Sequence, residues 1–349
     1  MQIFRYMDFV NVYLKFTFNP FKTHMKKIIY APMALVLFFA CQKKDAKQAE
    51  TALAETAAPT SRQCASMEVL EEQMKADPSR RDRMNEIENF TRQQIANGTV
   101  GRFVGDTMEI PVVVHVVYKT AAQNISDAQV RSQITVLNED FQMKNADNTK
   151  VPAHFAGVKA SSPIKFVLSQ IVRKATTKTS FSSNDGVKKA SQGGSDAINP
   201  TTTLNMWACN LGQGLLGYAQ FPGGPAATDG VVILYSAFGS QAKAAGTYSA
   251  SYNLGRTATH EVGHWLNLRH IWGDATCGSD LVGDTPTHNT SNGGCPAADH
   301  RSTCAGTPLE QWMNYMDYTY DACMYMFSQG QKDRMMATFA TGGPRASFR

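Results

Sequence analysis

Three histidines and one glutamate in the segment HEVGHWLNLRH have the types and the spacing of a zinc site. His260 and His264 are four residues apart, so on a helix both imidazoles lie on one face, about one turn from each other. His270 is the candidate third ligand, which leaves a fourth position open for water. Glu261, beside the first ligand, is placed to act on that water as general base and then as general acid. The pattern predicts zinc-assisted hydrolysis of a peptide bond.

Asn267 stands where the chain must leave the helix if His270 is to reach the same ion. A glycine would adopt the left-handed conformation needed for this reversal without strain. Asparagine is the other residue that tolerates this conformation, at a cost of about 1 kcal/mol. We therefore expect Asn267 to end the helix and to leave the site workable.

The elements that must position this motif predict a mixed α+β domain. The β-branched run IPVVVHVVY predicts a buried strand at 110–118, and IKFVLSQIV predicts another at 164–172. Further strands are expected in LNMWACNL, in LLGYAQFP and over 230–238, and apolar residues at helical spacing predict a helix within 126–141. We expect one catalytic domain over residues 104–349.

The N-terminal residues have the organisation of an export leader. Residues 1–41 contain an apolar run, Ile28–Ala40, that fits the core of a signal peptide and is short for a membrane span. Two lysines precede this run, which predicts that Met25 is the true start. Cys41 follows it directly, and FFAC resembles a bacterial lipoprotein box, although plain secretion is the alternative. Both interpretations put the mature protein outside the cytoplasm, as an outer-membrane lipoprotein or a secreted protein.

Two segments separate the leader from the catalytic domain. Residues 42–62 are rich in Ala, Thr and Glu without an apolar face and predict a flexible tether. Residues 63–103 are dense in charge and helix formers and predict a helical propeptide that packs on a larger domain. The glycine-containing stretch over 98–106 is the expected site of proteolytic clipping.

The net charge of the 349-residue chain comes from the leader. Residues 1–50 contain eight Lys/Arg and three Asp/Glu, which accounts for the formal net charge of +5 and leaves zero for the rest. The body therefore lacks the basic excess that attracts nucleic acid, and this class of partner is excluded. Membrane contact is expected only through a lipid anchor.

The chain has seven cysteines, and four of them crowd into its last quarter. In an oxidising compartment these four predict two disulfides, with three connectivities open. Cys209 lies within an expected apolar strand and is interpreted as a buried free cysteine.

From Cys64 to Met335 the chain resembles the pappalysin family of metzincin metallopeptidases. The resemblance rests on HEVGHWLNLRH, on DLVGDTP (280–286) and on MNYMDYTYDACMYMFSQGQKDRM (313–335). It implies a metzincin-like α+β fold with a twisted, mostly parallel sheet, an active-site helix and a loop-rich C-terminal subdomain stapled by disulfides. It also implies a zinc endopeptidase made as a zymogen, which is activated by another protease or by itself and cleaves protein or peptide substrates paired with the LLGYAQFP edge strand.

The same resemblance implies roles for single residues. Met316 matches the Met-turn beneath the zinc histidines, and Tyr318 matches a tyrosine that donates a hydrogen bond to the developing oxyanion. Asp321 matches an acidic residue that favours Arg just after the scissile bond. Cys64, in RQCAS, matches the propeptide cysteine that ligates zinc in the latent form, although Ala65 replaces the usual glycine.

Further implications concern the C-terminal loops. The family pairing joins Cys277 to Cys304 and Cys295 to Cys323. Calcium, the second expected metal, would be bound at Asp280, Asp284 and Thr285.

Two other functions stay open on the sequence. One is an inactive binding or adhesion lipoprotein on the same scaffold, against which the intact Glu261 argues. The other is a zinc hydrolase that acts on a non-peptide substrate.

Overall fold

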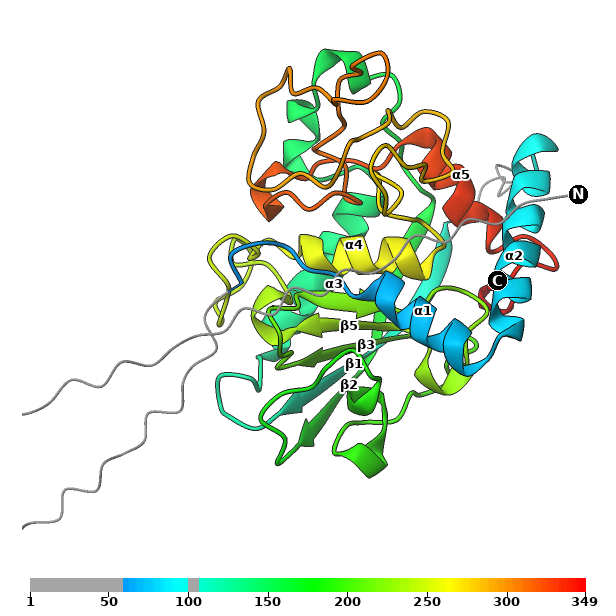
Figure 1. Ribbon diagram of the computed structural model, residues 1–349. Helices are drawn as coiled ribbons and strands as arrows, with labels where there is room; N and C mark the ends of the chain where they lie inside the picture. Colours follow the sequence, from blue (N-terminus) through cyan, green and yellow to red (C-terminus); the bar gives the residue numbers. More distant parts are fainter. Residues whose placement is uncertain (1–58, 100–106) are drawn as a thin grey trace, which may run out of the picture. The chain divides into compact units, whose positions relative to one another are not determined.

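The computed structural model describes residues 59–99 and 107–349 (Figure 1). The described residues form five α-helices: α1 (Ser66–Ala76), α2 (Ser79–Ala96), α3 (Asp127–Phe141), α4 (Arg256–Trp265) and α5 (Gln329–Ala337). They also form five strands: β1 (Met108–Tyr118), β2 (Ile164–Ala175), β3 (Leu204–Cys209), β4 (Gly217–Ala219) and β5 (Val231–Leu234). None of the helices within these ranges is long and apolar enough to cross a bilayer. The expected leader with Met25 and Cys41, most of the tether and most of the expected clipping segment lie outside the described residues.

The strands form one sheet in the order β2-β1-β3-β5-β4. The first four run parallel, and β4 pairs antiparallel with β5. The twisted, mostly parallel sheet expected from the sequence is confirmed. Strand β1 lies between β2 and β3 and is mostly buried, as its β-branched run predicts. Strand β4 is an edge of the sheet, and α4, which carries the histidine motif, packs against it.

The strand expected over 230–238 is wrong in its second half. Strand β5 ends at Leu234, and Tyr235–Ala237 forms a 3-10 turn. The Nε2 atom of Gln129, on α3, donates a 2.9 Å hydrogen bond to Phe238 O, so a side chain replaces a strand partner there. A short apolar run alone does not distinguish a buried strand from a buried turn.

Helices α3 and α4 lie on the sheet and against each other (Figure 1). Helix α3 contacts β2, whereas α4 contacts β4 and β5. Ser126 caps α3 by accepting a 3.1 Å hydrogen bond from Gln129 N. The two helices are joined by a 2.6 Å hydrogen bond from Thr259 Oγ1 to Asp140 Oδ2. This packing fixes α4, which carries the histidine motif, above the edge of the sheet.

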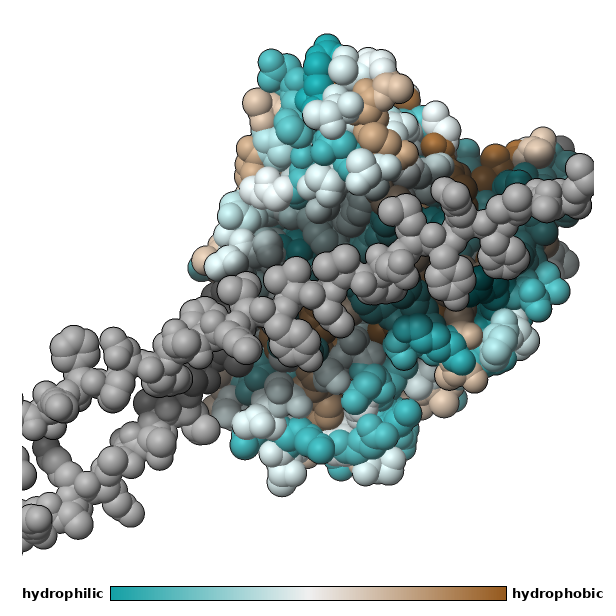
Figure 2. Space-filling model, in the orientation of Figure 1, coloured by the Kyte–Doolittle hydropathy of each residue, from teal (hydrophilic) through white to brown (hydrophobic). Residues whose placement is uncertain are grey.

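Segments from both ends of the described chain complete this body. Helix α1 contacts β4 and α2 contacts α5, so the N-terminal helices pack on the domain, as the sequence predicts. Between α4 and α5 the chain is mostly loop and is cross-linked by the disulfides Cys277–Cys304 and Cys295–Cys323. Hydrophilic residues cover much of the visible face of this loop region (Figure 2).

Candidate active site

The three histidines of the motif meet at one point. The Nε2 atom of His264 lies 3.2 Å from Nε2 of His260 and 3.1 Å from Nε2 of His270. All three side chains are buried. The structure therefore brings together the residues that the spacing singled out.

His270 reaches this point because the chain reverses at Asn267, whose φ is +72°. Asn267 N donates to His264 O at 2.9 Å, and Leu268 N donates to Gly263 O at 2.9 Å. These two bonds form the Schellman motif that ends many helices, usually with glycine at the left-handed position. Asn267 takes that position here, as expected.

The second ring nitrogen of each histidine is held by an oxygen atom. The Nδ1 partners are Tyr315 O at 2.7 Å for His260, Leu268 O at 2.8 Å for His264 and Asp274 Oδ1 at 2.5 Å for His270. Because carbonyl and carboxylate oxygens only accept, each Nδ1 carries the hydrogen and each Nε2 presents a lone pair. Three converging lone pairs repel one another unless a cation lies between them.

The geometry of this donor set fits zinc. A tetrahedral zinc with bonds of about 2.05 Å to nitrogen places its ligands about 3.3 Å apart, close to the observed separations. Burial, with the neighbouring histidines, lowers the pKa of His260 and of His264, which keeps the rings in the neutral, ligating form.

Cys64 supplies a fourth donor from the N-terminal segment. Its Sγ and the three ring nitrogens all lie within 4.8 Å of one another. The segment pairs with the free edge of β4, since Leu216 N donates to Gln63 O at 2.9 Å and Ala65 N donates to Gly217 O at 3.2 Å. Cys64 and Gly217 form a parallel bridge. The N-terminal segment thus occupies the edge on which a substrate strand was expected.

Glu261 is buried beside these donors and contacts the N-terminal segment. Its Oε2 accepts hydrogen bonds from Ser66 Oγ at 2.9 Å and from Cys64 Sγ at 3.3 Å. Burial raises the pKa of Glu261 to about 7, which suits a group that takes up and returns a proton near neutral pH. Burial and the Glu261 carboxylate raise the pKa of the Cys64 thiol, an effect that a cation at the histidines opposes.

Met316 and Tyr318 flank the histidines from the C-terminal part. A Cβ added to Gly263 would lie 2.5 Å from Met316 Sδ, so this glycine lets the methionine pack directly against α4. The Tyr318 ring centroid lies 5.0 Å from that of His270. Its hydroxyl donates to Cys64 O at 3.3 Å and accepts from Cys64 N at 3.3 Å. A peptide group next to the histidines is thus within reach of the tyrosine.

The guanidinium of Arg62 fills a buried site beside the carboxylate of Asp321, and we call this site the Asp321 pocket. The Arg62 Nη2 atom donates to Asp321 Oδ1 at 2.7 Å, and both side chains are buried. The guanidinium also donates to Thr257 Oγ1 at 3.1 Å and to Thr319 O at 3.3 Å. The other carboxylate oxygen of Asp321 accepts from Arg256 N at 3.2 Å, at the start of α4. One carboxylate therefore joins the pocket to the helix that carries the motif.

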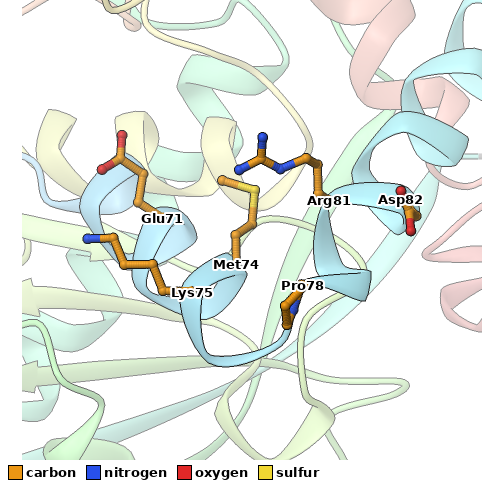
Figure 3. A pocket seen from close by; sticks show the side chains of 6 residues that line it. All are labelled: Glu71, Met74, Lys75, Pro78, Arg81 and Asp82. Atoms are coloured by element: carbon orange, nitrogen blue, oxygen red, sulfur yellow. The ribbon is translucent and has the colours of Figure 1, made fainter.

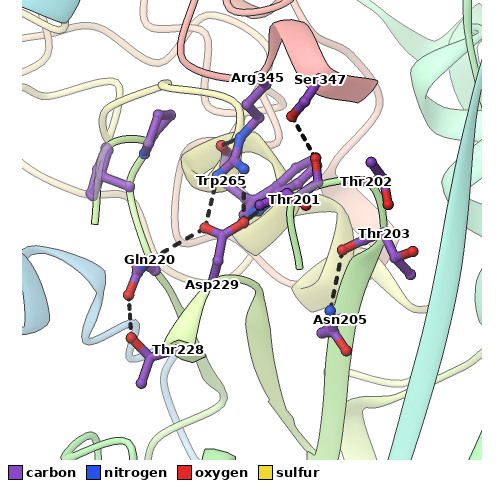
Figure 4. Close-up of polar contacts among 12 residues, drawn as sticks. Thr201, Thr202, Thr203, Asn205, Gln220, Thr228, Asp229, Trp265, Arg345 and Ser347 are labelled. Atoms are coloured by element: carbon purple, nitrogen blue, oxygen red, sulfur yellow. Dashed lines mark hydrogen bonds and ion pairs between the residues drawn. The ribbon is translucent and has the colours of Figure 1, made fainter. Parts of the chain in front are cut away.

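The far end of α4 is held by Asp229 (Figure 4). Trp265 Nε1 donates to Asp229 Oδ2 at 3.0 Å, and Arg345 donates to both carboxylate oxygens at 2.8 and 3.1 Å. Arg345 also donates to Trp265 O at 2.7 Å. These contacts fix the position of Trp265, which directly follows His264.

In the loop expected to bind calcium, only two of the three predicted ligand residues lie together. Both oxygens of Asp280 lie 2.9 Å from Thr285 Oγ1, and burial raises the pKa of Asp280 to about 7. Asp284 instead accepts hydrogen bonds from Ser328 Oγ at 2.7 Å and Gly330 N at 2.9 Å, at the start of α5. The structure thus brings Asp280 and Thr285 together and directs the Asp284 side chain elsewhere.

Several contacts at the site were not predicted from the sequence. Arg62 was recognised only as part of the segment around Cys64, and Asp274, which bonds His270, carries no motif signal. Ser66 bonds Glu261 and was equally unforeseen.

Comparison with known proteins places this site in a family. The peptidase family model described as "Pregnancy-associated plasma protein-A" matches residues 192–340. An extracellular metalloprotease of Arthroderma benhamiae is 32% identical over 231 residues, which are 65% of this chain and 75% of that protein. One from Pyricularia oryzae is 32% identical over 253 residues, or 70% and 79% of the two chains.

Two solved structures from Tannerella forsythia agree with this placement. A promirolysin mutant is 44% identical with a TM-score of 0.74, covering 82% of this chain and 97% of that one. Mature mirolysin in complex with a cleaved peptide is 48% identical with a TM-score of 0.67, covering 70% and 96%. The chain is therefore a secreted zinc metalloendopeptidase, and it belongs to the pappalysin family of metzincin metallopeptidases.

Proposed function

We propose that His260, His264 and His270 hold the catalytic zinc and that Glu261 is the general base and acid of peptide hydrolysis. The convergence of three lone-pair-bearing Nε2 atoms beside a buried carboxylate carries this proposal. When bound, zinc would lower the pKa of a water molecule and polarise the scissile carbonyl. Glu261 Oε2 takes the proton from the attacking water and returns it to the leaving amine.

Tyr318 donates a hydrogen bond to the carbonyl oxygen of the scissile peptide as negative charge develops there. The contact that supports this role is its hydroxyl bond to Cys64 O, a carbonyl at the position next to the histidines. Met316 keeps the floor beneath the histidines apolar and rigid, since it packs against Gly263.

The described chain is the latent form. Residues 63–103 are the propeptide, Cys64 Sγ is the fourth zinc ligand, and the bonds of Cys64 and Ser66 to Glu261 occupy the base. Cleavage between residues 98 and 106, by another protease or by the enzyme itself, releases this segment and opens the fourth position. Residues 104–349 are then the active enzyme.

Asp321 selects Arg in the substrate residue after the scissile bond. The supporting observation is Arg62, whose guanidinium fills the Asp321 pocket two residues before the cysteine at the metal position. A substrate Arg in the same pocket would make the same charge-assisted hydrogen bonds.

Two further assignments complete the proposal. Calcium binds at Asp280 and Thr285, and Asp284 joins it only if its side chain leaves the start of α5. Cys41 is lipidated and anchors the enzyme to the outer membrane, with plain secretion as the alternative.

The test is cleavage of casein and of an Arg-containing peptide by the clipped protein and by its Glu261→Ala variant. Loss of the base is expected to reduce kcat by at least about a hundredfold. Thermal unfolding and zinc content of both proteins serve as controls for folding and metal loading. Equal activity in two folded, zinc-loaded proteins would remove Glu261 from the mechanism.

A further inference from the structure

We propose that the active enzyme has a second subsite for a basic side chain, formed by the backbone carbonyls of Phe221, Pro222 and Gly223. In the latent form Arg80 of the propeptide fills it. This inference rests on the proposed function, because it places the new subsite relative to the Asp321 pocket. We call residues Phe221–Gly223 the carbonyl turn.

Arg80 enters this turn as a buried cation and, among residues 59–99 and 107–349, forms no ion pair with a carboxylate. Its Nη1 donates to Pro222 O at 2.7 Å and its Nη2 to Phe221 O at 2.9 Å, while the side chain is 1% exposed. Burial lowers the pKa of Arg80 to about 10. Arg83 Nε adds a 3.3 Å bond to Gly223 O. The neighbouring Arg81 is exposed instead and lines the hollow between α1 and α2 (Figure 3).

The carbonyl turn is held from inside the catalytic domain. Thr228 Oγ1 donates to Gln220 Oε1 at 2.7 Å (Figure 4). Gln220 Nε2 in turn donates to Pro225 O at 2.9 Å. The carboxylate of Asp229 favours the charged form of Arg80, whereas Arg83 and the Arg345 that pairs with Asp229 oppose it, so the carbonyls are the groups that hold the guanidinium. Loss of the propeptide thus leaves the carbonyls oriented and without their donors. Unpaired, oriented carbonyls attract a cation with hydrogen-bond donors.

The position of the carbonyl turn relative to the histidines follows from the direction of the propeptide. This segment runs parallel to β4, from Arg62 in the Asp321 pocket, past Cys64 at the histidines, toward the end of the strand. The turn follows β4 directly, and the Phe221 ring centroid lies 5.3 Å from that of His264. If Asp321 binds the residue after the scissile bond, the turn lies on the opposite side of the metal.

An extended substrate on β4 would present its side chains to the turn about three to five residues before the scissile bond. Two adjacent carbonyls match the fixed fork of a guanidinium better than the single ammonium of Lys. The preferred substrates are therefore cationic polypeptides with one Arg after the cut and a second Arg upstream of it.

The experiment uses the clipped enzyme and peptides with Arg after the scissile bond. One upstream position at a time, from the second to the fifth, carries Arg, Lys or the neutral isostere citrulline. At one position at least, Arg is expected to raise kcat/KM about tenfold over citrulline, mainly through KM, with Lys between them. A ratio below about twofold at every position, in peptides that are still cleaved, overturns the subsite. Cleavage of none of the peptides would instead contradict the proposed function.

A variant of the turn gives a second readout. Gly223 has a φ of +82°, and a Cβ there would lie 2.8 Å from Arg80 Nη1. Gly223→Asn tolerates this conformation and fills the space that a guanidinium needs. The ratio of kcat/KM for the Arg and citrulline peptides should fall toward one. An unchanged ratio in a folded variant would also overturn the proposal.

Discussion

The guanidinium of Arg62 and the carboxylate of Asp321 form a 2.7 Å ion pair in which both side chains are shielded from water. A buried pair of this kind is specific, because either partner left alone is a desolvated charge. The site therefore fits the guanidinium of Arg62. The same carboxylate caps the start of α4, so the residue that holds this guanidinium also positions the motif helix.

Asp321→Asn should lower kcat/KM for peptides with Arg after the scissile bond by about a hundredfold. The oxygen that accepts from Leu254 N and Arg256 N would be retained, which turns the new NH2 group toward the guanidinium. Peptides with Ala at that position serve as the matched comparison, and urea denaturation reports folding. Equal losses for Arg and Ala peptides would assign Asp321 a purely structural role.

The sequence predicts the convergence of the histidines well because a helix makes residue spacing equivalent to geometry. His260 and His264 follow from that rule, and Asn267 follows from the conformation that the reversal needs. The long strands are predicted for a similar reason, because a buried run of β-branched residues is most often a β-strand.

The unpredicted contacts depend on tertiary packing. The pairing of Arg62 with Asp321 joins residues 259 positions apart, and no local pattern encodes it. The end of β5 at Leu234 depends on a side chain of α3, and the orientation of Asp284 depends on the start of α5. Such contacts become visible only when the elements are placed together.

Loss of the Cys295–Cys323 disulfide should weaken selectivity for Arg. Cys323 ends the 3-10 turn that begins at Asp321, so this bridge tethers the pocket carboxylate. The double Ser variant is expected to lose about 2–4 kcal/mol of unfolding free energy and part of its preference for Arg over Ala peptides. The Cys277–Cys304 double variant is the control, expected to lose stability with the preference kept. Identical preferences in both variants would contradict the tether.

Asp274→Asn should weaken zinc retention by about tenfold. The carboxylate holds Nδ1 of His270 at 2.5 Å, which fixes the ring and makes Nε2 a better donor. Asn keeps an acceptor oxygen and tolerates the φ of +56° at this position, so the substitution isolates the charge. Competition with a fluorescent zinc chelator measures the effect. Retention equal to that of the parent protein would leave Asp274 without a role at the metal.

Asn267→Ala should destabilise the protein by about 1 kcal/mol relative to Asn267→Gly. Clipping removes Thr91, whose Oγ1 accepts a weak 3.4 Å bond from Asn267 Nδ2, so in the clipped variants the difference reports the left-handed backbone together with the smaller unfolded-chain entropy of Ala. Urea denaturation of the two clipped proteins gives the free energies, and zinc retention should follow the same order. Equal stabilities would show that the backbone conformation costs nothing at this turn.

Cys64→Ala should hasten activation of the zymogen, because it removes both the fourth metal donor and a contact to Glu261. Ser66 and Arg62 would still hold the segment, so the variant is expected to fold. Cys209→Ala is the matched control, since Cys209 is the other free cysteine among the described residues and is buried in β3.

Two measurements separate the metal contact from simple loosening of the propeptide. The time course of clipping and casein cleavage gives the rate of activation, and chelator competition gives the rate of zinc loss before clipping. A zymogen with four protein donors should lose zinc more slowly than Cys64→Ala, which keeps three. Faster activation with unchanged zinc loss would mean that Cys64 stabilises the propeptide without binding the metal. Equal latency in Cys64→Ala and Cys209→Ala would remove Cys64 from the switch.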